Sequence, residues 1–204
     1  MKKFIFPSCL FFFIILTSQN CKKHNEPILY NTEFPNNIGT FWKYKVYDSI
    51  SNQIDTVIIT VQNKTILNNG LEATVWLIES LVNLNDTNYV TNNSDGIKIY
   101  KNKIVSAPYI KKYEFPLKVN KKWVNINLLD TSKVILSINT NIIAGNFIET
   151  YLIRREYYSF PGFNYYKEED YFVNNIGLIK RRLFENSLGT FKNQTWELLS
   201  YQIN

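Results

Sequence analysis

Short runs of alternating apolar and polar residues recur along most of the chain. In FWKYKVY, residues 41–47, Trp42, Tyr44 and Val46 fall on one face and two lysines on the other, which is the two-residue period of a half-buried strand. Comparable runs end at Asn, Gly, Pro or Asp, residues that favour turns. They are DTVIITVQ (55–62), ATVWLIE (73–79), IKIY (97–100), VILSI (134–138), TYLIRREYY (150–158) and TWELLSY (195–201).

The composition supports a β-rich chain. Aromatic residues make up 16% of the sequence, and there are 27 asparagines but only three alanines. Aromatic and β-branched residues favour strands, whereas scarce alanine disfavours helices. We therefore predict an all-β fold of antiparallel meanders that form a barrel, half-barrel or sandwich.

Four sequence blocks occur twice in the same order. FPNNIGTFW (34–42) resembles FPLKVNKKW (115–123), and YVTNNSDGIKI (89–99) resembles YFVNNIGLIK (171–180). Between them, VIITV (57–61) matches VILSI, and WLIE (76–79) matches YLIR (151–154). We predict one domain over 34–204 that duplicates a five-strand meander, with repeats at about 34–114 and 115–204. The alternative is convergence on similar strand and turn residues.

The first block suggests a structural device. Proline holds the preceding phenylalanine extended, and Gly39 or Asn120 then permits a turn before the tryptophan strand. Under a duplication, Trp42 and Trp123 occupy equivalent core positions, and Phe34, Ile38 and Trp42 could pack as a plug at one end of the sheet. The alternative is an exposed aromatic platform for a glycan or peptide.

The N-terminus has the layout of a signal peptide. Lys2 and Lys3 precede an apolar run at 4–16 and a short polar segment, and that run is shorter than the roughly 20 residues of a spanning helix. We predict a signal peptide at 1–20; the alternative is a buried N-terminal helix. Its removal deletes two lysines and no acids, so the net charge falls from +6 to +4.

Cys21 directly follows this segment, and no cysteine occurs after it. A lone cysteine at this place resembles the lipidated cysteine of bacterial lipoproteins, although Ser18 and Asn20 depart from the usual signal. The resemblance implies an acylated Cys21 and a polar tether over 21–33, which contains the only histidine, His24. Cleavage by an ordinary signal peptidase is the alternative.

The second half resembles a recurrent pattern in uncharacterised exported bacterial proteins. FPLKVNKKW, AGNFIET (144–150) and NNIGLIKRR (174–182) carry the likeness, with Asn120 in place of the usual glycine. The resemblance implies a β-rich domain of the cell envelope and assigns no activity.

Few residues suggest catalysis. The body has no histidine, no cysteine pair and no glycine-rich phosphate loop, so we assign no catalytic residue, metal ligand or cofactor. The mild charge and the lack of a recognised motif indicate no nucleic-acid partner. The best enzymatic candidate is the acidic run Glu168, Glu169 and Asp170 among aromatic residues, which could serve glycoside hydrolysis. Alternation places Glu168 and Asp170 on one face and Glu169 on the other.

The segment YYSFPGFNYY, 157–166, is the best candidate contact surface. Aromatic residues surround a Pro-Gly turn signal, and strand alternation would leave part of them exposed at a hairpin tip. We predict ligand or partner contact at Tyr158, Phe160, Phe163 and Tyr165, with an envelope protein or glycan as the partner.

The expected function is therefore that of a membrane-anchored envelope lipoprotein with a non-catalytic binding or structural domain. Membrane lipid is its partner through acylated Cys21. The outer membrane is the expected location, and the periplasmic and surface faces both stay open. One alternative is a lipid or lipoprotein carrier with an apolar cavity lined from both repeats. The other is a carboxylate-dependent glycoside hydrolase.

Overall fold

A computed structural model of the chain describes residues 33–104, 109–126, 129–159, 164–187 and 189–204. These residues form twelve β-strands. The strands of the first half are β1 (Phe41–Asp48), β2 (Gln53–Ile66), β3 (Glu72–Ser80), β4 (Asp86–Asn93), β5 (Gly96–Tyr100) and β6 (Ile110–Tyr113). Those of the second half are β7 (Lys122–Val124), β8 (Thr131–Ile142), β9 (Gly145–Ser159), β10 (Asn164–Val173), β11 (Gly177–Ser187) and β12 (Thr190–Gln202).

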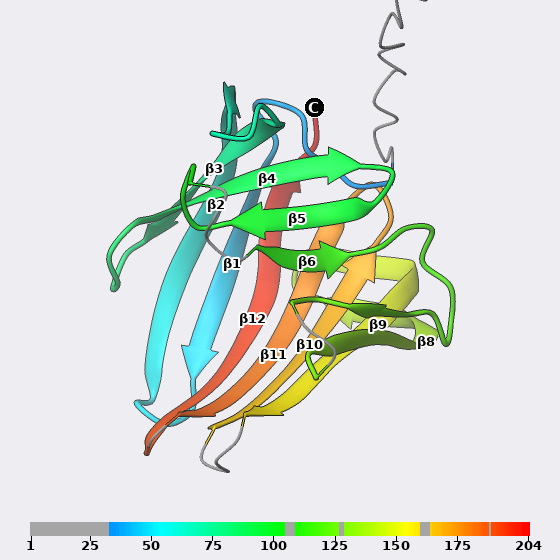
Figure 1. The fold of residues 1–204 in the computed structure, drawn as a ribbon. Helices are drawn as coiled ribbons and strands as arrows, with labels where there is room; N and C mark the ends of the chain where they lie inside the picture. Colours follow the sequence, from blue (N-terminus) through cyan, green and yellow to red (C-terminus); the bar gives the residue numbers. More distant parts are fainter. Residues whose placement is uncertain (1–32, 105–108, 127–128, 160–163, 188) are drawn as a thin grey trace, which may run out of the picture.

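All twelve strands belong to one antiparallel sheet, in the order β6-β5-β4-β3-β2-β1-β12-β11-β10-β9-β8-β7. The first and last strands therefore pair in the middle, and β6 and β7 are the sheet edges. The sheet curls until these edges approach each other (Figure 1). There the Lys111 N–H donates to the Asn125 carbonyl at 3.1 Å, and the Trp123 indole donates to the Lys111 carbonyl at 3.2 Å. The result is a nearly closed, barrel-like sheet.

The predicted all-β fold is confirmed, but several strands are longer than the sequence runs suggested. β2 has 14 residues and β9 has 15, because register shifts let a strand bend around the barrel without ending. Shifts occur after Val61 in β2 and after Val134 and Ile138 in β8. Within the described ranges, no helix has the length and apolarity needed to cross a membrane.

The interior face follows the alternation predicted for the first strand. Trp42, Tyr44 and Val46 are all at most 4% exposed, while Lys45 faces solvent. The predicted packing of Phe34, Ile38 and Trp42 at one end of the sheet forms only in part. Phe34 is buried and its ring stacks on Trp76, which also contacts Trp42. Ile38, by contrast, is 51% exposed and takes no part.

The matched sequence blocks fall on strands with the same rank in each half. Gly39 and Asn120 both have positive φ, 88° and 73°, and both turns make the same bonds. The Gly39 N–H donates to the Val61 carbonyl at 2.8 Å, and the Asn120 N–H donates to the Val134 carbonyl at 2.9 Å. Trp42 and Trp123 follow these turns as buried residues of β1 and β7. That a duplication produced the halves stays a prediction.

Two details of the predicted repeat differ in the structure. Each half has six strands rather than five, because the matched blocks end on the fifth strand of each half and leave out the sixth, which is β6 in the first half and β12 in the second. The alignment of the second block also shifts. The sequence matched Val57 with Val134, but the turn hydrogen bonds make Val61 the equivalent residue, four positions later. Residues four apart share a face of a strand, so apolar alternation alone fits either register.

Candidate functional site

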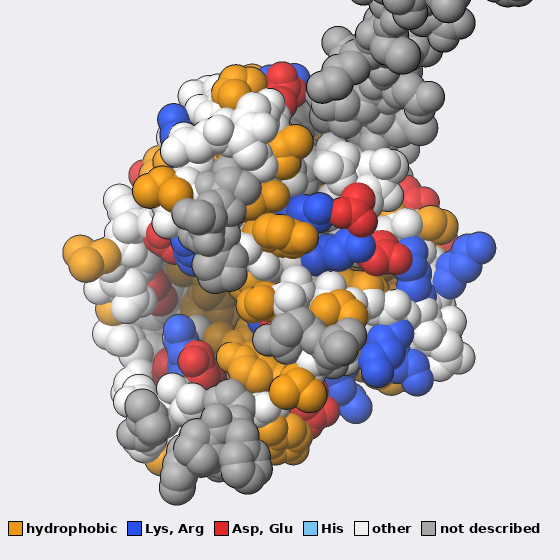
Figure 2. All heavy atoms as spheres, viewed as in Figure 1, with side chains coloured by type: hydrophobic (Ala, Val, Ile, Leu, Met, Phe, Trp, Pro, Cys, Tyr) orange, Lys and Arg blue, Asp and Glu red, His pale blue; other side chains and the backbone are white. Residues whose placement is uncertain are grey.

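The barrel-like sheet contains a cavity of about 330 Å³. Strands of both halves line it, and Figure 2 shows a hollow on one face of the molecule with hydrophobic side chains inside. Small-molecule sites are concave, mostly apolar and about 300–1,000 Å³ in volume, so this cavity is the best candidate site. Its apolar lining consists of Phe34, Trp42, Ile59, Trp76, Ile78, Ile99, Ile110, Leu178 and Trp196.

Three aromatic side chains that line the cavity, Phe34, Trp42 and Trp76, pack against one another. Phe34 and Trp76 stack with centroids 5.7 Å apart, and Trp42 lies 5.1 Å from Trp76. Both indole N–H groups bond to the protein: Trp42 donates to the Ile176 carbonyl at 2.6 Å, and Trp76 donates to Asn36 Oδ1 at 2.7 Å. The rings are therefore held in place, and their donors are already used.

A buried ion network forms one wall of the barrel interior. Lys112 of edge strand β6 contacts Glu168 and lies 3.1 Å from Asp170, both on β10. Arg181 of β11 binds both oxygens of Asp170, at 2.6 and 3.0 Å, and the Tyr113 hydroxyl donates to Asp170 at 2.8 Å. The predicted alternation is confirmed: Glu168 and Asp170 point inward together.

Glu169 lies between these two carboxylates in sequence and on the opposite face of the sheet. Its carboxylate pairs with Arg154 at 2.8 Å, and Lys167 lies 3.6 Å away. The acidic run is thus divided between the barrel interior and its outer surface.

The network sets the protonation of its members. Burial alone would raise the pKa of Asp170, but Arg181 and Lys112 hold that pKa well below its usual range. Burial likewise disfavours a charged Arg181, yet Asp170 and Glu168 raise the pKa of the guanidinium. Burial raises the pKa of Tyr113, and the Asp170 charge raises it further. Asp170 is therefore a fixed anion that accepts hydrogen bonds and is poorly suited to donate a proton.

A second ion pair extends the wall toward β9. Arg155 binds Asp130 through two hydrogen bonds of 2.7 and 2.6 Å, and its guanidinium lies 4.9 Å from the Tyr166 ring centroid. The Tyr166 hydroxyl donates to Glu168 at 2.8 Å. Every charged group of this wall thus has a partner of opposite charge. Within the described ranges, no group of three or more His, Cys, Asp or Glu side chains could hold a metal ion.

Asn88 of β4 is the polar lining residue whose hydrogen bonds are incomplete. It is only 9% exposed and lies beside Trp76 in the β3–β4 ladder. Its side-chain oxygen is buried and has no hydrogen-bond partner. Buried polar atoms are nearly always bonded, so an unpartnered acceptor in a cavity wall is a candidate ligand contact.

A polar mouth adjoins the cavity through Ile78 and Trp196, which line both spaces. This outer space has a volume of about 430 Å³, and Asp48, Asp55 and Lys192 are among its lining residues. The β1–β2 and β11–β12 turns lie near it, at the end of the barrel opposite the one where the described chain begins (Figure 1).

The loop between β3 and β4 borders the mouth. Asp55 organises this loop by accepting hydrogen bonds from the Ser80 hydroxyl at 2.5 Å and the Leu81 N–H at 3.1 Å. Burial opposes the charge of Asp55, but these hydrogen bonds lower the pKa of its carboxyl. Leu81 and Leu84 of the same loop are 82% and 95% exposed.

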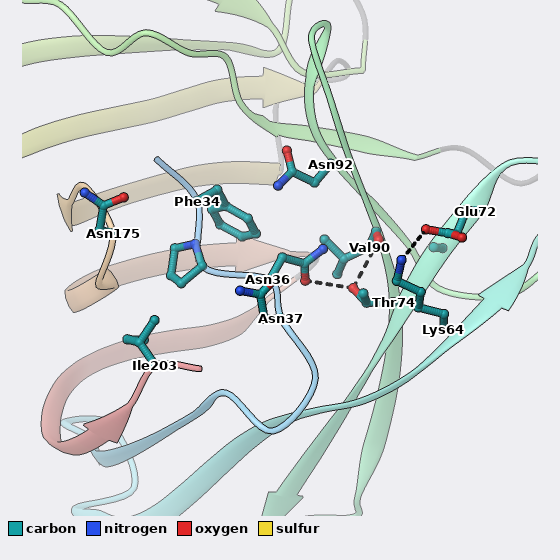
Figure 3. Close-up of a pocket in the computed structure, with 12 residues that line it drawn as sticks. Phe34, Asn36, Asn37, Lys64, Glu72, Thr74, Val90, Asn92, Asn175 and Ile203 are labelled. Atoms are coloured by element: carbon teal, nitrogen blue, oxygen red, sulfur yellow. Dashed lines mark hydrogen bonds and ion pairs between the residues drawn. The ribbon is translucent and has the colours of Figure 1, made fainter. Parts of the chain in front are cut away.

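A separate pocket of about 370 Å³ lies at the end where the described chain begins. Figure 3 shows its polar lining: Asn36 accepts a hydrogen bond from Thr74 at 2.7 Å, and Lys64 pairs with Glu72 at 2.8 Å. Phe34 lines both this pocket and the interior cavity. The two spaces therefore adjoin each other at Phe34.

Two of the predicted contact residues, Tyr158 and Tyr165, are not among the residues that line the cavity. Tyr158 is 66% exposed and stacks on Tyr165 with centroids 4.8 Å apart, and the Tyr165 hydroxyl donates to Glu156 at 2.7 Å. Phe160, Phe163 and Cys21 are outside the described residues. The predicted contact surface and the lipidation of Cys21 stay predictions.

Fold and cavity together define an all-β, nearly closed barrel of antiparallel strands with an internal ligand-sized space. No protein-family model and no curated protein sequence matches the chain. Two solved structures are similar. A "putative exported protein with YmcC-like fold" from Bacteroides fragilis aligns with a TM-score of 0.52 and 10% identity, over 86% of this chain and 99% of that one.

The second is a "putative lipoprotein" from Parabacteroides distasonis. It aligns with a TM-score of 0.51 and 12% identity, over 87% of this chain and 100% of that one. At such low identity the likeness shows a shared fold. In both cases the fold accounts for nearly the whole of the other chain.

Proposed function

We propose that the protein is a lipoprotein of the bacterial cell envelope whose barrel-like domain binds a small, largely apolar ligand without altering it chemically. The interior cavity carries the proposal, because both halves line it and it adjoins a mouth. This is the geometry expected for the carrier alternative, which needs a cavity lined from both repeats. The carboxylates suggested for hydrolysis are instead engaged by Arg181 and Lys112.

The envelope location rests on the N-terminal sequence and on the fold. The signal-peptide layout and Cys21 favour export followed by lipidation, most simply at the outer membrane. The two similar structures carry "exported protein" and "lipoprotein" in their descriptions.

Ligand binding can be tested with N-phenyl-1-naphthylamine, a neutral fluorophore that brightens in apolar surroundings. We expect saturable fluorescence with the wild-type protein. Ile59→Trp should raise the dissociation constant at least about tenfold, since Ile59 lines the cavity and a larger side chain occupies its volume. The matched control is Ile54→Trp on the same strand, where the side chain is 58% exposed. Equal binding by both variants would place the probe elsewhere, and no binding by the wild type would refute the proposal.

Lipidation has its own test in cells. Growth with an alkyne analogue of palmitate should label the wild-type protein and leave Cys21→Ser unlabelled. Cys9→Ser is the matched control, because Cys9 lies in the predicted signal peptide and its loss should leave labelling unchanged. Labelling that persists in Cys21→Ser would exclude this residue as the anchor.

A further inference from the structure

Four cations and one carboxylate, Glu168, line the cavity, and each of the cations is held in an ion pair. Four lining cations each have a carboxylate within ion-pair distance: Lys101 with Asp86, Lys112 with Glu168, Arg155 with Asp130 and Arg181 with Asp170. A charged ligand would have to compete with these ion pairs for a partner of opposite charge. The cavity therefore favours a neutral molecule.

The aromatic donors of the lining are also used. The indole N–H of Trp196 donates to Gln194 at 3.3 Å and the Tyr44 hydroxyl donates to the Leu178 carbonyl at 2.8 Å. The N–H groups of Trp42 and Trp76 and the hydroxyls of Tyr113 and Tyr166 bond to other protein groups, as described above. A ligand that only accepts hydrogen bonds thus gains little from these groups.

Asn88, by contrast, offers a hydrogen-bond acceptor. Its unpartnered oxygen is an acceptor, and leaving a buried acceptor unsatisfied costs free energy that a donor restores. The oxygen itself is buried. A turn of the amide about its soft terminal torsion would present the oxygen to the cavity and place the NH2 group where the oxygen now lies.

We propose that the ligand is a neutral amphiphile with a hydrogen-bond donor, such as a hydroxyl group, and that Asn88 accepts that hydrogen bond. The apolar part of the ligand packs against the aromatic and aliphatic lining contributed by both halves. This inference rests on the proposed binding function and adds the chemical class of the ligand.

The test compares four compounds that share a ten-carbon chain as competitors of N-phenyl-1-naphthylamine, all at submicellar concentration. They are 1-decanol, its methyl ether, decanoate and decylamine. We expect 1-decanol to displace the probe at about one tenth of the concentration that the ether needs, since one hydrogen bond separates them. Decanoate and decylamine should be weaker still, because the cavity leaves their charge unpaired.

Asn88→Leu tests whether Asn88 accepts the hydrogen bond from the hydroxyl group of the ligand. The variant keeps a similar shape but lacks the acceptor, so it should bind the ether as the wild type does and lose the preference for the alcohol. Thr87→Val is the matched control, because Thr87 is the neighbouring β4 residue with its side chain on the other face. It should keep the full preference.

The outcomes separate the two proposals. Equal displacement by alcohol and ether in the wild type, or best displacement by a charged compound, would overturn the inference about the ligand and leave the binding function standing. An alcohol preference that survives in folded Asn88→Leu would overturn the role of Asn88. Failure of every compound, including the fluorophore itself, would refute the binding function. Should Asn88→Leu not fold, the wild-type comparison still decides the ligand class.

Discussion

Asn88 and Asp170 occupy matching positions in the two halves and have opposite surroundings. Each directly precedes the tyrosine that opens the fourth matched block, Tyr89 on β4 and Tyr171 on β10. Both side chains are buried, at 9% and 2% exposure. Asp170 accepts hydrogen bonds from Arg181 and Tyr113, whereas the side-chain oxygen of Asn88 has no partner.

The contrast between Asn88 and Asp170 shows that equivalent strand positions can serve two different purposes. Around Asp170 of the second half, cations and a tyrosine tie β10 and β11 to β6 of the first half across the interior. The equivalent side chain of the first half, Asn88, lines the cavity beside Trp76 and is left for a ligand. We infer that the position of Asp170 serves the rigidity of the barrel and the position of Asn88 serves recognition.

The largest expected effect comes from removing the partnered residue. Asp170→Leu leaves Arg181 and Lys112 buried with one carboxylate fewer, and breaking a buried ion pair in this way costs about 3–5 kcal/mol. Urea unfolding of the protein should show this loss in the free energy of unfolding. Glu169→Leu is the control, since this neighbour, itself 12% exposed, pairs on the outer face with Arg154, which is 37% exposed, and the loss of such a partly exposed pair should cost less than the loss of the interior pairs. Similar losses in both variants would contradict a special role of the interior network.

Acid should weaken the protein through the same residue. The pKa of Asp170 is lower in the folded state than in the unfolded chain, so its contribution is complete above the unfolded value near 3.9 and is lost as the pH falls below it. Between about pH 4 and pH 2, the wild-type free energy of unfolding should fall more steeply than that of Asp170→Asn. One proton accounts for at most about 1.4 kcal/mol per pH unit. Parallel pH profiles would show that Asp170 is not held as an anion.

A smaller loss of stability is expected when Tyr113, the tyrosine of the ion network, is replaced. Tyr113→Phe removes the hydroxyl that donates to Asp170 at 2.8 Å and leaves the ring in the aromatic cluster. Hydrogen bonds to charged groups contribute about 1.5–3 kcal/mol, so the variant should be destabilised within that range. The effect should shrink in the Asp170→Leu background, and a double-mutant cycle by urea unfolding measures the coupling. Additive losses would mean that the two residues act independently.

The local parts of this architecture follow from the sequence. The buried face of β1 was predicted because alternation is a property of one strand, and the division of Glu168 and Asp170 from Glu169 follows from the same period. Turn positions such as Gly39 and Asn120 were predicted because the matched blocks place a turn-forming residue before each tryptophan.

The interior site depends on contacts between distant residues. Lys112 stands in IKKY, a segment whose lysines suggest a solvated edge, and it is buried only because Glu168 comes to it from 56 residues later. Asn88 is one of 27 asparagines, most simply interpreted as turn formers. A cavity is volume that side chains do not fill, so no local pattern of residues marks it.

Asn88→Leu should have the smallest effect on stability, and its sign is the informative part. The substitution removes a buried acceptor without breaking a hydrogen bond, and it places an apolar side chain beside Trp76. An apolar replacement of an unsatisfied polar group is neutral or stabilising, so the free energy of unfolding should stay level or rise by up to about 1 kcal/mol. Asp170→Leu, the matching substitution in the other half, should lower the free energy of unfolding by several times this amount. A loss above about 2 kcal/mol for Asn88→Leu would mean that the Asn88 oxygen has a hydrogen-bond partner within the protein, and the contrast between the two halves would not hold.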